Sequence, residues 1–269
     1  MLETVVMLAT VRQDRILAAL AARGSVRITD LATELDVSDM TVRRDLSELA
    51  GRGLLRKVHG GAVAADQHPA SYEPGFQAKA DREGAEKEAI ARAAAELVQP
   101  GSAVALSAGT TTHALARVLA SSPLLRPLTV VTNSLPVADT LFRTGDTTVT
   151  TVLIGGERTP SDALVGPLAE AALATLRVDV AFLGAHGISP AAGLTTPNLA
   201  ESATDRALVA SAATTVVLAD HTKWRATGLS RWAALDDVDV LVTDDGLPEA
   251  DQDEARELVG RLVVAEVAR

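Results

Sequence analysis

The stretch "SAGTTT", residues 107–112, joins a glycine to three consecutive threonines directly after a run of small apolar residues. Gly109 allows a ligand to approach the backbone closely, and the amides of Thr110, Thr111 and Thr112 are unpaired donors that begin a helix. The threonine hydroxyls add further donors, so this stretch is suited to holding a phosphate group. Taken alone, the pattern is also typical of an ordinary strand-to-helix turn.

A second stretch, "SDMTVRRDL" at residues 38–46, is suited to reading DNA. Arginine can form bidentate hydrogen bonds with guanine O6 and N7 or hold a phosphate, and threonine can contact a thymine methyl group or a phosphate. An alternative is that the arginines form a solvated helix face and pair with Asp39 and Glu48. The residues expected to contact DNA from this stretch are Ser38, Met40, Thr41, Arg43 and Arg44.

Three helices and a small β hairpin are predicted around this stretch. "RQDRILAALAAR" predicts the first helix, "ITDLATELDVS" the second with Thr29 as its N-cap, and "DMTVRRDLSELAGRG" the third, which Ser38 caps. "LLRKVHGGAV" predicts a β wing whose basic residues meet the sugar-phosphate backbone, namely Arg56, Lys57 and His59. Residues 1–63 are therefore expected to form a winged helix-turn-helix, with the start of the third helix in the major groove.

The rest of the chain predicts a linker and a larger domain. Residues 64–86 lose hydrophobic periodicity and contain two prolines and mixed charge, which favours a linker. From 87 to 269, continuous Val, Leu and Ala runs alternate with helical segments, which predicts a mostly parallel sheet buried on both faces. The expected fold is thus an N-terminal winged helix-turn-helix (α with a small β wing) and a C-terminal α/β domain with a mostly parallel sheet.

The carboxyl ends of parallel strands meet at one edge of a sheet, where ligands bind in such folds. Further candidates for that edge are Asn133, Ser134, Gly155, Gly156, His186, His221 and Lys223, with Glu201 and Arg206 on a following helix. Each has an ordinary alternative: a plain turn at the glycines, a structural role for His186, a surface cation at Lys223, and a helix cap at Asn133.

The composition excludes several classes of site and protein. The chain has no cysteine, which excludes disulfides and thiol chemistry and fits a reducing compartment. No apolar run approaches the roughly 18 residues needed to cross a bilayer, so we expect a cytoplasmic protein without membrane contact. The net charge is −10, yet residues 1–63 carry nine Lys and Arg against eight Asp and Glu. The acidity therefore belongs to the larger C-terminal part.

Beyond these patterns, "VSDMTVRRDLSELAGRGLLRKVHGGAV" resembles the signature of the DeoR family of bacterial transcription regulators. The later segments "AGTTT", "LTVVTNS", "LIGGE", "LVGPLAE", "GLTTPNLAES" and "LADHTKW" keep the family's order, so only "MLETVVMLAT" lies outside the resemblance. The resemblance implies a winged helix-turn-helix, usually of a repressor, joined to a sensor domain similar to ribose-5-phosphate isomerase and coenzyme A transferases. It also implies a sugar-phosphate site on the "AGTTT" loop.

Three positions depart from the family pattern. Ser107 and His186 stand where relatives often carry Asp, and Asp205 stands where Lys is common. The related isomerases move a proton with a carboxylate base, so the first two changes disfavour that chemistry, although Glu201 or Asp220 could substitute. The changes also favour an unusual effector.

We therefore expect a repressor that binds operator DNA less well when a phosphorylated sugar or related metabolite binds, with no catalytic residues, cofactor or metal. Two alternatives stay open: a sugar-phosphate isomerase or transferase-like enzyme with an appended DNA-binding unit, and a protein-interaction module. Paired recognition helices require a homo-oligomer, a dimer or a tetramer. The expected effector site comprises Ser107, Gly109, Thr110, Thr111, Thr112, Asn133, Gly156, His186, Glu201 and Lys223.

Overall fold

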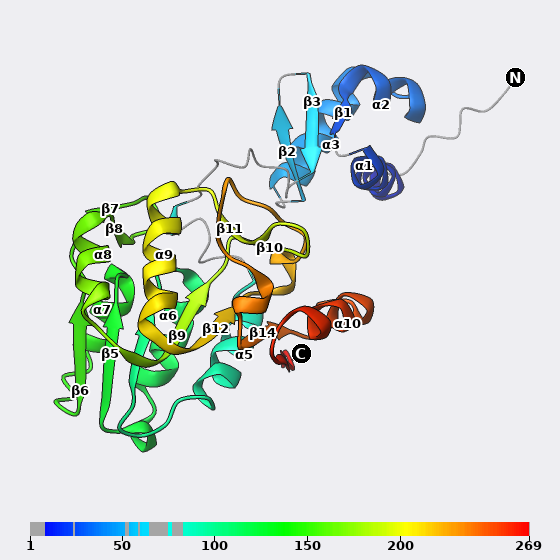
Figure 1. Cartoon of the computed structure of the whole chain (residues 1–269). Helices are drawn as coiled ribbons and strands as arrows, with labels where there is room; N and C mark the ends of the chain where they lie inside the picture. Colours follow the sequence, from blue (N-terminus) through cyan, green and yellow to red (C-terminus); the bar gives the residue numbers. More distant parts are fainter. Residues whose placement is uncertain are drawn as a thin grey trace, which may run out of the picture. The chain divides into compact units, whose positions relative to one another are not determined.

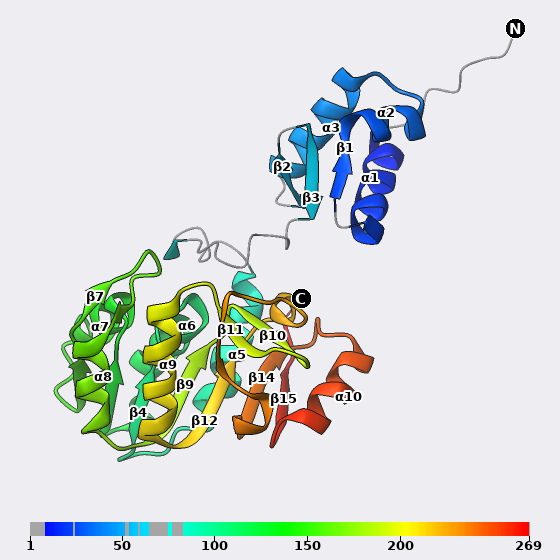
Figure 2. The same ribbon diagram turned by 45° about the horizontal axis from the view of Figure 1, so that its top comes forward.

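The computed structural model describes residues 9–23, 25–51, 54–58, 60–64, 75–76 and 83–268. The chain divides into two compact units, Met1–Pro69 and Ala70–Arg269, which are described separately (Figures 1 and 2). His59 and most of the predicted linker 64–86 lie outside the described residues. The boundaries expected at residues 63 and 86 therefore stay predictions.

The described part of the N-terminal unit contains three helices and a three-stranded antiparallel sheet of order β1-β3-β2. Its elements are α1 (Ala9–Arg23), β1 (Ser25–Arg27), α2 (Ile28–Leu35), α3 (Asp39–Gly51), β2 (Leu55–Val58) and β3 (Gly61–Ala64). The helices and the β2–β3 hairpin confirm the predicted winged helix-turn-helix. Strand β1 was not predicted, because three residues are too few to show an alternating pattern.

The helix starts of this unit test two predicted caps. Ser38 caps α3 as predicted, since its Oγ accepts the Thr41 amide at 3.2 Å. The predicted cap at Thr29 is wrong, because α2 begins at Ile28 after the extended Arg27. Ile28 is buried in the unit's core, and the helix begins two residues earlier than a Thr29 cap would place it. The fully buried side chains that hold the three helices together are Ile16, Val42, Leu46 and Leu49.

The C-terminal unit is built on a seven-stranded sheet of order β15-β14-β12-β9-β4-β5-β6, and all its neighbouring strands are parallel. This confirms the predicted α/β domain. The strands are β4 (Ala103–Leu106), β5 (Leu128–Thr132), β6 (Val149–Leu153), β9 (Val178–Gly184), β12 (Ala212–Leu218), β14 (Val240–Asp244) and β15 (Leu262–Ala265).

Helices cover both faces of this sheet (Figure 2). The buried cluster on one face includes residues of α5 (Gly84–Ala95), α6 (Thr110–Ala120) and α7 (Leu135–Phe142). The cluster on the other face includes residues of α8 (Pro167–Ala174), α9 (Leu199–Ser211) and α10 (Glu249–Leu258). Both clusters consist mainly of small aliphatic side chains, and the wholly buried Phe182 of the central strand β9 is an exception.

Two small antiparallel sheets were not predicted. One pairs β7 (Glu157–Arg158) with β8 (Leu164–Val165), and the other joins β10 (Gly187–Ser189), β11 (Gly193–Thr196) and β13 (Ser230–Ala233). Among the described residues there are also three single-turn 3-10 helices: η1 (Pro123–Leu125), η2 (His221–Lys223) and η3 (Leu235–Asp237). The loops that carry these short elements bring distant polar residues to the carboxyl edge of the main sheet.

Candidate functional site

Helix α3 presents two basic side chains to solvent. Arg43 and Arg44 are exposed, and neither forms a salt bridge or a side-chain hydrogen bond with a described residue. The carboxylate of Glu48, an expected partner in the alternative interpretation, instead accepts the Gln13 Nε2 of α1 at 2.9 Å. The two guanidinium groups are therefore available to a polyanion.

The first turn of α3 holds the other predicted DNA contacts. The Oγ of Ser38 and the Oγ1 of Thr41 are hydrogen-bonded at 2.9 Å, so these hydroxyls define the start of the helix. Met40 is 74% exposed beside them. An exposed apolar side chain and two hydroxyls at a helix start can contact base edges and phosphates. Contacts by these three residues stay a prediction.

The wing is tied to the same helix. Lys57 of β2 is exposed, and its Nζ donates to the Oγ of Ser47 on α3 at 2.8 Å. Arg56 is half-buried next to it, and His59 lies outside the described residues. The basic strand and the basic helix therefore belong to one rigid surface.

An ion pair between α1 and α3 fixes the helix that carries the arginines. The side chains of Asp45 and Arg12 are 3% and 11% exposed. Arg12 donates from Nε and, at 3.0 Å, from Nη2 to the two carboxylate oxygens. This hydrogen bonding raises the pKa of Arg12. In "RRDL", the aspartate therefore holds the helix in place while the arginines face outward.

The start of α6 lies at the carboxyl end of β4. Gly109 has a φ of +148°, which L side chains rarely adopt, and its carbonyl accepts the His113 amide at 3.0 Å. That bond is the first of the helix, so the amides of Thr110, Thr111 and Thr112 have no partner within it. Thr112 is fully buried and its hydroxyl donates to the Gly109 carbonyl at 3.0 Å, so this residue fixes the turn, and Thr110 and Thr111 are the threonines left to face a ligand.

Ser107 braces two neighbouring strand ends. It is 2% exposed, its Oγ accepts the Gly184 amide of β9 at 3.0 Å, and its hydroxyl donates to the Ala108 carbonyl at 3.2 Å. A carboxylate here could also accept the amide, but its charge would lie beside the helix start. Ser107 instead keeps the spacing of the loops without adding negative charge.

Asn133 joins the loop after β5 to two others. Its Oδ1 accepts the Ala108 amide at 3.0 Å, and its Nδ2 donates to the Leu164 carbonyl at 3.2 Å. The alternative of a helix cap at Asn133 is wrong, because Ser134 caps α7 by accepting the Val137 amide. With 2% exposure, Asn133 shapes the edge of the sheet.

A buried lysine that sequence reasoning missed lies at the same edge. Lys87 of α5 is 5% exposed; its burial lowers its pKa, and the charge of Lys223 adds to this effect while that of Asp220 opposes it. The apolar face of α5 includes Ile90, Ala91 and Ala94, so Lys87 occupies a core position of the helical repeat. That spacing is the signal that could have identified it.

Asp220 follows β12 and connects the two lysines. It is 1% exposed, and its Oδ1 accepts the Thr222 amide at 3.2 Å. Its Oδ2 is buried without a hydrogen-bond partner among the described residues, 4.0 Å from the Lys223 Nζ. Lys223 is therefore oriented by a buried carboxylate at the carboxyl end of β12 and differs from an ordinary surface lysine.

His221 is held by the neighbouring strand. Its Nδ1 is 2.7 Å from Oδ2 of Asp244, which is fully buried at the end of β14, and its amide donates to Oδ1 at 2.7 Å. The side chain of His221 is 32% exposed. A histidine fixed in this way presents Nε2 toward solvent beside Lys223.

Glu201 lies on the first turn of α9 and accepts two hydroxyls. Thr159 donates to its Oε1 at 2.7 Å and Thr196 to its Oε2 at 3.3 Å. Asp205 follows one turn later, and its pKa is raised well above the usual value by burial and by the charge of Glu201. The Arg206 side chain turns to Ser202 and the Arg231 carbonyl. This side of the edge is therefore acidic.

Two predicted site residues have less to offer a ligand. A Cβ at Gly156 would lie 2.5 Å from the Val165 carbonyl oxygen, so this glycine is required by the close approach of β8. His186 is half-buried between β9 and β10. The plain-turn interpretation fits Gly156, whereas a ligand contact of His186 stays a prediction.

A residue of the predicted linker packs beside α6. Phe76 is 7% exposed, its ring centroid is 5.5 Å from that of His113, and its amide donates to the Pro160 carbonyl at 3.2 Å. The His113 Nε2 is 2.8 Å from the Thr140 hydroxyl oxygen, and burial lowers the pKa of this histidine. Phe76 of the predicted linker therefore packs against His113, the residue that directly follows the three threonines.

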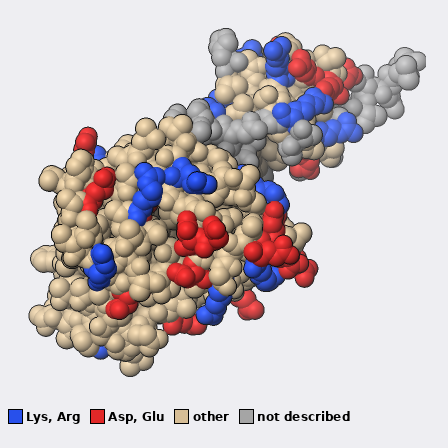
Figure 3. All heavy atoms as spheres, in the orientation of Figure 1, with Lys and Arg blue, Asp and Glu red and all other residues tan. Residues whose placement is uncertain are grey.

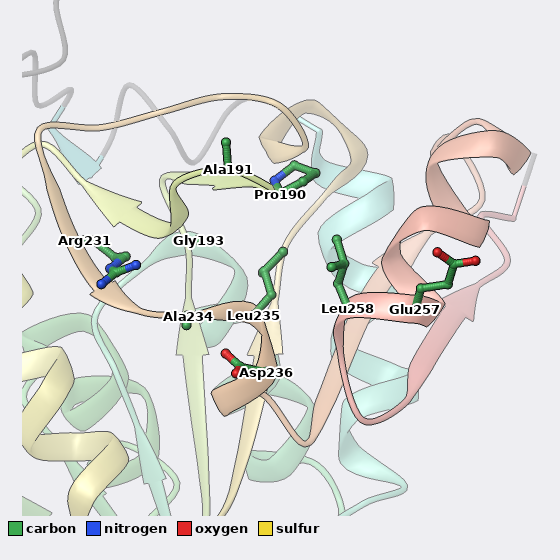
Figure 4. A pocket seen from close by; sticks show the side chains of 9 residues that line it. All are labelled: Pro190, Ala191, Gly193, Arg231, Ala234, Leu235, Asp236, Glu257 and Leu258. Carbon is green, nitrogen blue, oxygen red and sulfur yellow. The ribbon is translucent and has the colours of Figure 1, made fainter.

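A separate groove of about 300 Å³ lies between η3 and the last turn of α10 (Figure 4). η3 precedes β14 and α10 precedes β15, so the groove lies toward the amino ends of these strands. Its lining residues include Arg231, Asp236 and Glu257 and none of the predicted site residues. It therefore does not belong to the edge described above.

The described residues also lack two further features. They contain no group of three or more His, Cys, Asp or Glu that could hold a metal ion. None of the described helices is long and apolar enough to span a membrane.

Comparison with known proteins gives consistent matches. A model of the DeoR C terminal sensor domain matches residues 82–245, and a model of the DeoR-like helix-turn-helix domain matches residues 12–68. The HTH-type transcriptional regulator GlpR of Haloferax volcanii is 35% identical over 98% of this chain and 100% of its own length. The transcriptional repressor AccR of Agrobacterium fabrum is 36% identical over 87% of this chain and 89% of its own.

A third relative is the lactose phosphotransferase system repressor of Staphylococcus aureus, 34% identical over 87% of this chain and 91% of that protein. Among solved structures, a ribose-5-phosphate isomerase in complex with phospho-erythronic acid covers 51% of this chain and 52% of its own, with 17% identity and a TM-score of 0.38. This likeness is too low to carry an argument.

Proposed function

The chain belongs to the DeoR family of transcription regulators, and from this premise we propose that it is a repressor released from its operator by a phosphorylated sugar or polyol. The exposed arginines of α3 and the basic wing bind the operator. The carboxyl edge of the main sheet binds the effector. Two of the relatives are named repressors, which supports the direction of regulation.

The observation that carries the effector site is the gathering of cationic donors at neighbouring strand ends. Lys87 and Lys223 lie around Asp220 after β12, and the free amides of α6 follow β4. Only β9 separates these two strands in the sheet, so their ends are about 10 Å apart at ~4.8 Å per strand. Helix-start amides and lysines are the donors that phosphate prefers.

Hydroxyl-rich ligands also fit the rest of the edge. Glu201 is an acceptor on the far side, and the Nε2 of His221 can donate or accept beside Lys223. A site with cationic donors at one end and carboxylate acceptors at the other favours a phosphate ester whose remaining atoms carry hydroxyl groups. An anion without hydroxyl groups would contact only the cationic end of the site.

Binding at the α6 start is proposed to reach the DNA-binding unit through Phe76. The phosphate would contact Thr110 and Thr111, and His113 on the same helix turn touches the linker ring. Pro160, which holds the Phe76 amide, adjoins Thr159, the partner of Glu201. The effector must bind the released state more tightly than the operator-bound state, since equal affinities would shift no population.

Thermal unfolding of the full chain tests the site. The probes are inorganic phosphate, ribose 5-phosphate, fructose 1-phosphate and glycerol 3-phosphate, each against its unphosphorylated counterpart where one exists. A ligand at 100 times its Kd stabilises the folded state by about 2.7 kcal/mol. Lys87→Met and Lys223→Ala should remove this stabilisation, whereas Lys57→Ala in the wing should retain it. A ligand shift that survives in both site variants contradicts the proposed site.

We also infer that the chain does not convert its ligand. Ser107 and Asn133 are committed to bracing loops, and Asp244 is committed to His221, so these groups do not face a reacting carbon. Turnover of any of the same sugar phosphates by the full chain, followed by NMR, would favour the isomerase alternative. Binding without turnover supports a sensor.

A further inference from the structure

Strand β6 forms one free edge of the main sheet. It pairs with β5 in parallel register from Leu128↔Val149 to Thr132↔Leu153. No described residue pairs with its other side, so the outward backbone amides and carbonyls of this strand are open to another strand (Figure 1). An open edge of this kind is a template for strand pairing.

The edge lacks the devices that usually prevent such pairing. Its sequence "VTTVL" contains no charged residue, proline or glycine. Thr150, Val152 and Leu153 are exposed, the last two by 37% and 44%. Proteins blunt free edges with charged side chains, proline or bulges, and β6 has none of them. An uncharged edge of this kind favours pairing with another strand.

The opposite edge of the same sheet is protected. Every residue of β15 is buried or half-buried, and the strand lies between Arg261 and Glu266. Helix α10 beside it carries Glu249, Asp251, Asp253, Glu254 and Glu257. The β15 edge is therefore covered and lies beside acidic residues, whereas the β6 edge is exposed and uncharged. A second copy, which is also acidic, can approach β6 more easily than β15.

Charge also favours β6 as the contact with another copy. Residues 64–269 carry 16 Lys and Arg against 27 Asp and Glu, so two C-terminal units repel each other over most of their surface. Around β6 three arginines are paired with aspartates: Arg126 with Asp146 at 2.8 Å, Arg143 with Asp139 at 2.8 Å and Arg158 with Asp162 at 2.6 Å, while Glu157 is exposed after the strand. In Figure 3 the part of the unit where β6 lies is mostly uncharged, and acidic residues gather farther toward α10.

The neighbouring helix adds apolar surface. α7 packs on β6, and its last residue, Phe142, is 81% exposed. A phenylalanine buries a large apolar area when covered, which stabilises an interface beyond the strand hydrogen bonds. Phe142, Val152 and Leu153 give a second copy both apolar contacts and a backbone to pair with.

We propose that β6 is the dimer interface, where two copies pair their β6 strands antiparallel across a two-fold axis and join their sheets. A two-fold axis between the two β6 strands makes the contact isologous, because each copy supplies the same residues. This inference rests on the proposed operator binding at one point: a dimer with two-fold symmetry matches an operator with two half-sites. Operator binding alone identifies neither β6 as the contact surface nor the register in which a second copy pairs with it.

Sedimentation velocity of the full chain over a concentration series tests the interface. The unaltered protein should be a dimer, and Val152→Lys should raise the dimer dissociation constant by 100-fold or more through a buried like-charge pair. Leu124→Lys is the matched control, because Leu124 is 88% exposed on η1 and outside β6. A monomeric unaltered chain, or equal dissociation constants for both variants, overturns the proposal.

Cysteine cross-linking gives an answer that does not depend on the folding of the lysine variant. The chain has no cysteine, so Thr150→Cys, Thr151→Cys and Val152→Cys each introduce a single thiol. The position nearest the two-fold axis should form an intermolecular disulfide under mild oxidation, and Leu124→Cys should not. Equal cross-linking at all four positions overturns the proposal. Operator binding by the unaltered chain is measured separately, so its failure is distinguishable from failure of the interface.

Discussion

Replacing Asp45 by alanine should unfold the N-terminal unit and leave the C-terminal unit folded. Asp45 and Arg12 are 2% and 9% exposed and share two hydrogen bonds between α1 and α3. Removing one partner of a buried pair costs about 3–5 kcal/mol, because the other charge stays buried without compensation. Unit Met1–Pro69, at ~0.05–0.15 kcal/mol per residue, has a total stability of about 3–10 kcal/mol. The loss therefore removes a large part or all of it.

Hydrogen exchange of the full chain, read by mass spectrometry, measures this loss in each unit. Peptides from α1 and α3 should exchange roughly 10²- to 10³-fold faster, since ~1.4 kcal/mol corresponds to a factor of ten. Peptides from β9 and β12 should not change. The control is Glu34→Ala, which breaks the pair of Arg23 and Glu34, whose side chains are 51% and 41% exposed, and costs at most about 1 kcal/mol. Unchanged protection of α3 in Asp45→Ala would refute the role given to this pair.

Three further predictions concern binding, strain and charge. Arg43→Ala and Arg44→Ala should each lower the salt slope of operator binding by about 1 in a fluorescence anisotropy titration, whereas Arg143→Ala in the other unit should leave it unchanged. Gly156→Ala should lower the free energy of unfolding of the C-terminal unit, measured in urea, by about 1–3 kcal/mol, because the new Cβ would meet the Val165 carbonyl. Gly155→Ala is the control and should be neutral, since a Cβ at Gly155 meets nothing. Asp205→Asn should stabilise the protein at neutral pH. The folded state raises the pKa of Asp205, so the unaltered protein loses stability as the pH rises above 3.8, the ordinary pKa of this carboxyl. The urea midpoints of the two proteins should therefore converge below that pH.

The sequence predicted the main elements of both units because their residues repeat with the period of the element. Val42, Leu46 and Leu49 recur at helical spacing and all three are fully buried. The Val, Leu and Ala runs of the seven strands are continuous because both faces of the sheet are covered. Strands of two to four residues, such as β7 and β10, have no period to detect, and long-range pairing alone defines them.

The site was predicted less completely, because the role of a polar residue depends on what its fold brings next to it. Ser107 and Asn133 were correctly placed at the sheet edge, yet their side chains brace loops. Lys87 was missed, although its helical spacing with Ile90 and Ala94 marks it as a core position. Its charged neighbours Asp220 and Lys223 come from the far end of the domain, and no local pattern contains that contact.

The three departures from the family pattern act on the two ends of the proposed site in opposite ways. At the cationic end, Ser107 keeps the loop spacing that a carboxylate would keep but places no negative charge beside the α6 amides. At the acidic end, Asp205 stands where a lysine could have neutralised Glu201, and burial together with the charge of Glu201 raises the pKa of Asp205. A second phosphate or carboxylate on the ligand would meet this end unfavourably. We therefore expect the proposed site to favour a ligand with one anionic end and hydroxyl donors at the other, and to bind bisphosphates and sugar-acid phosphates less tightly.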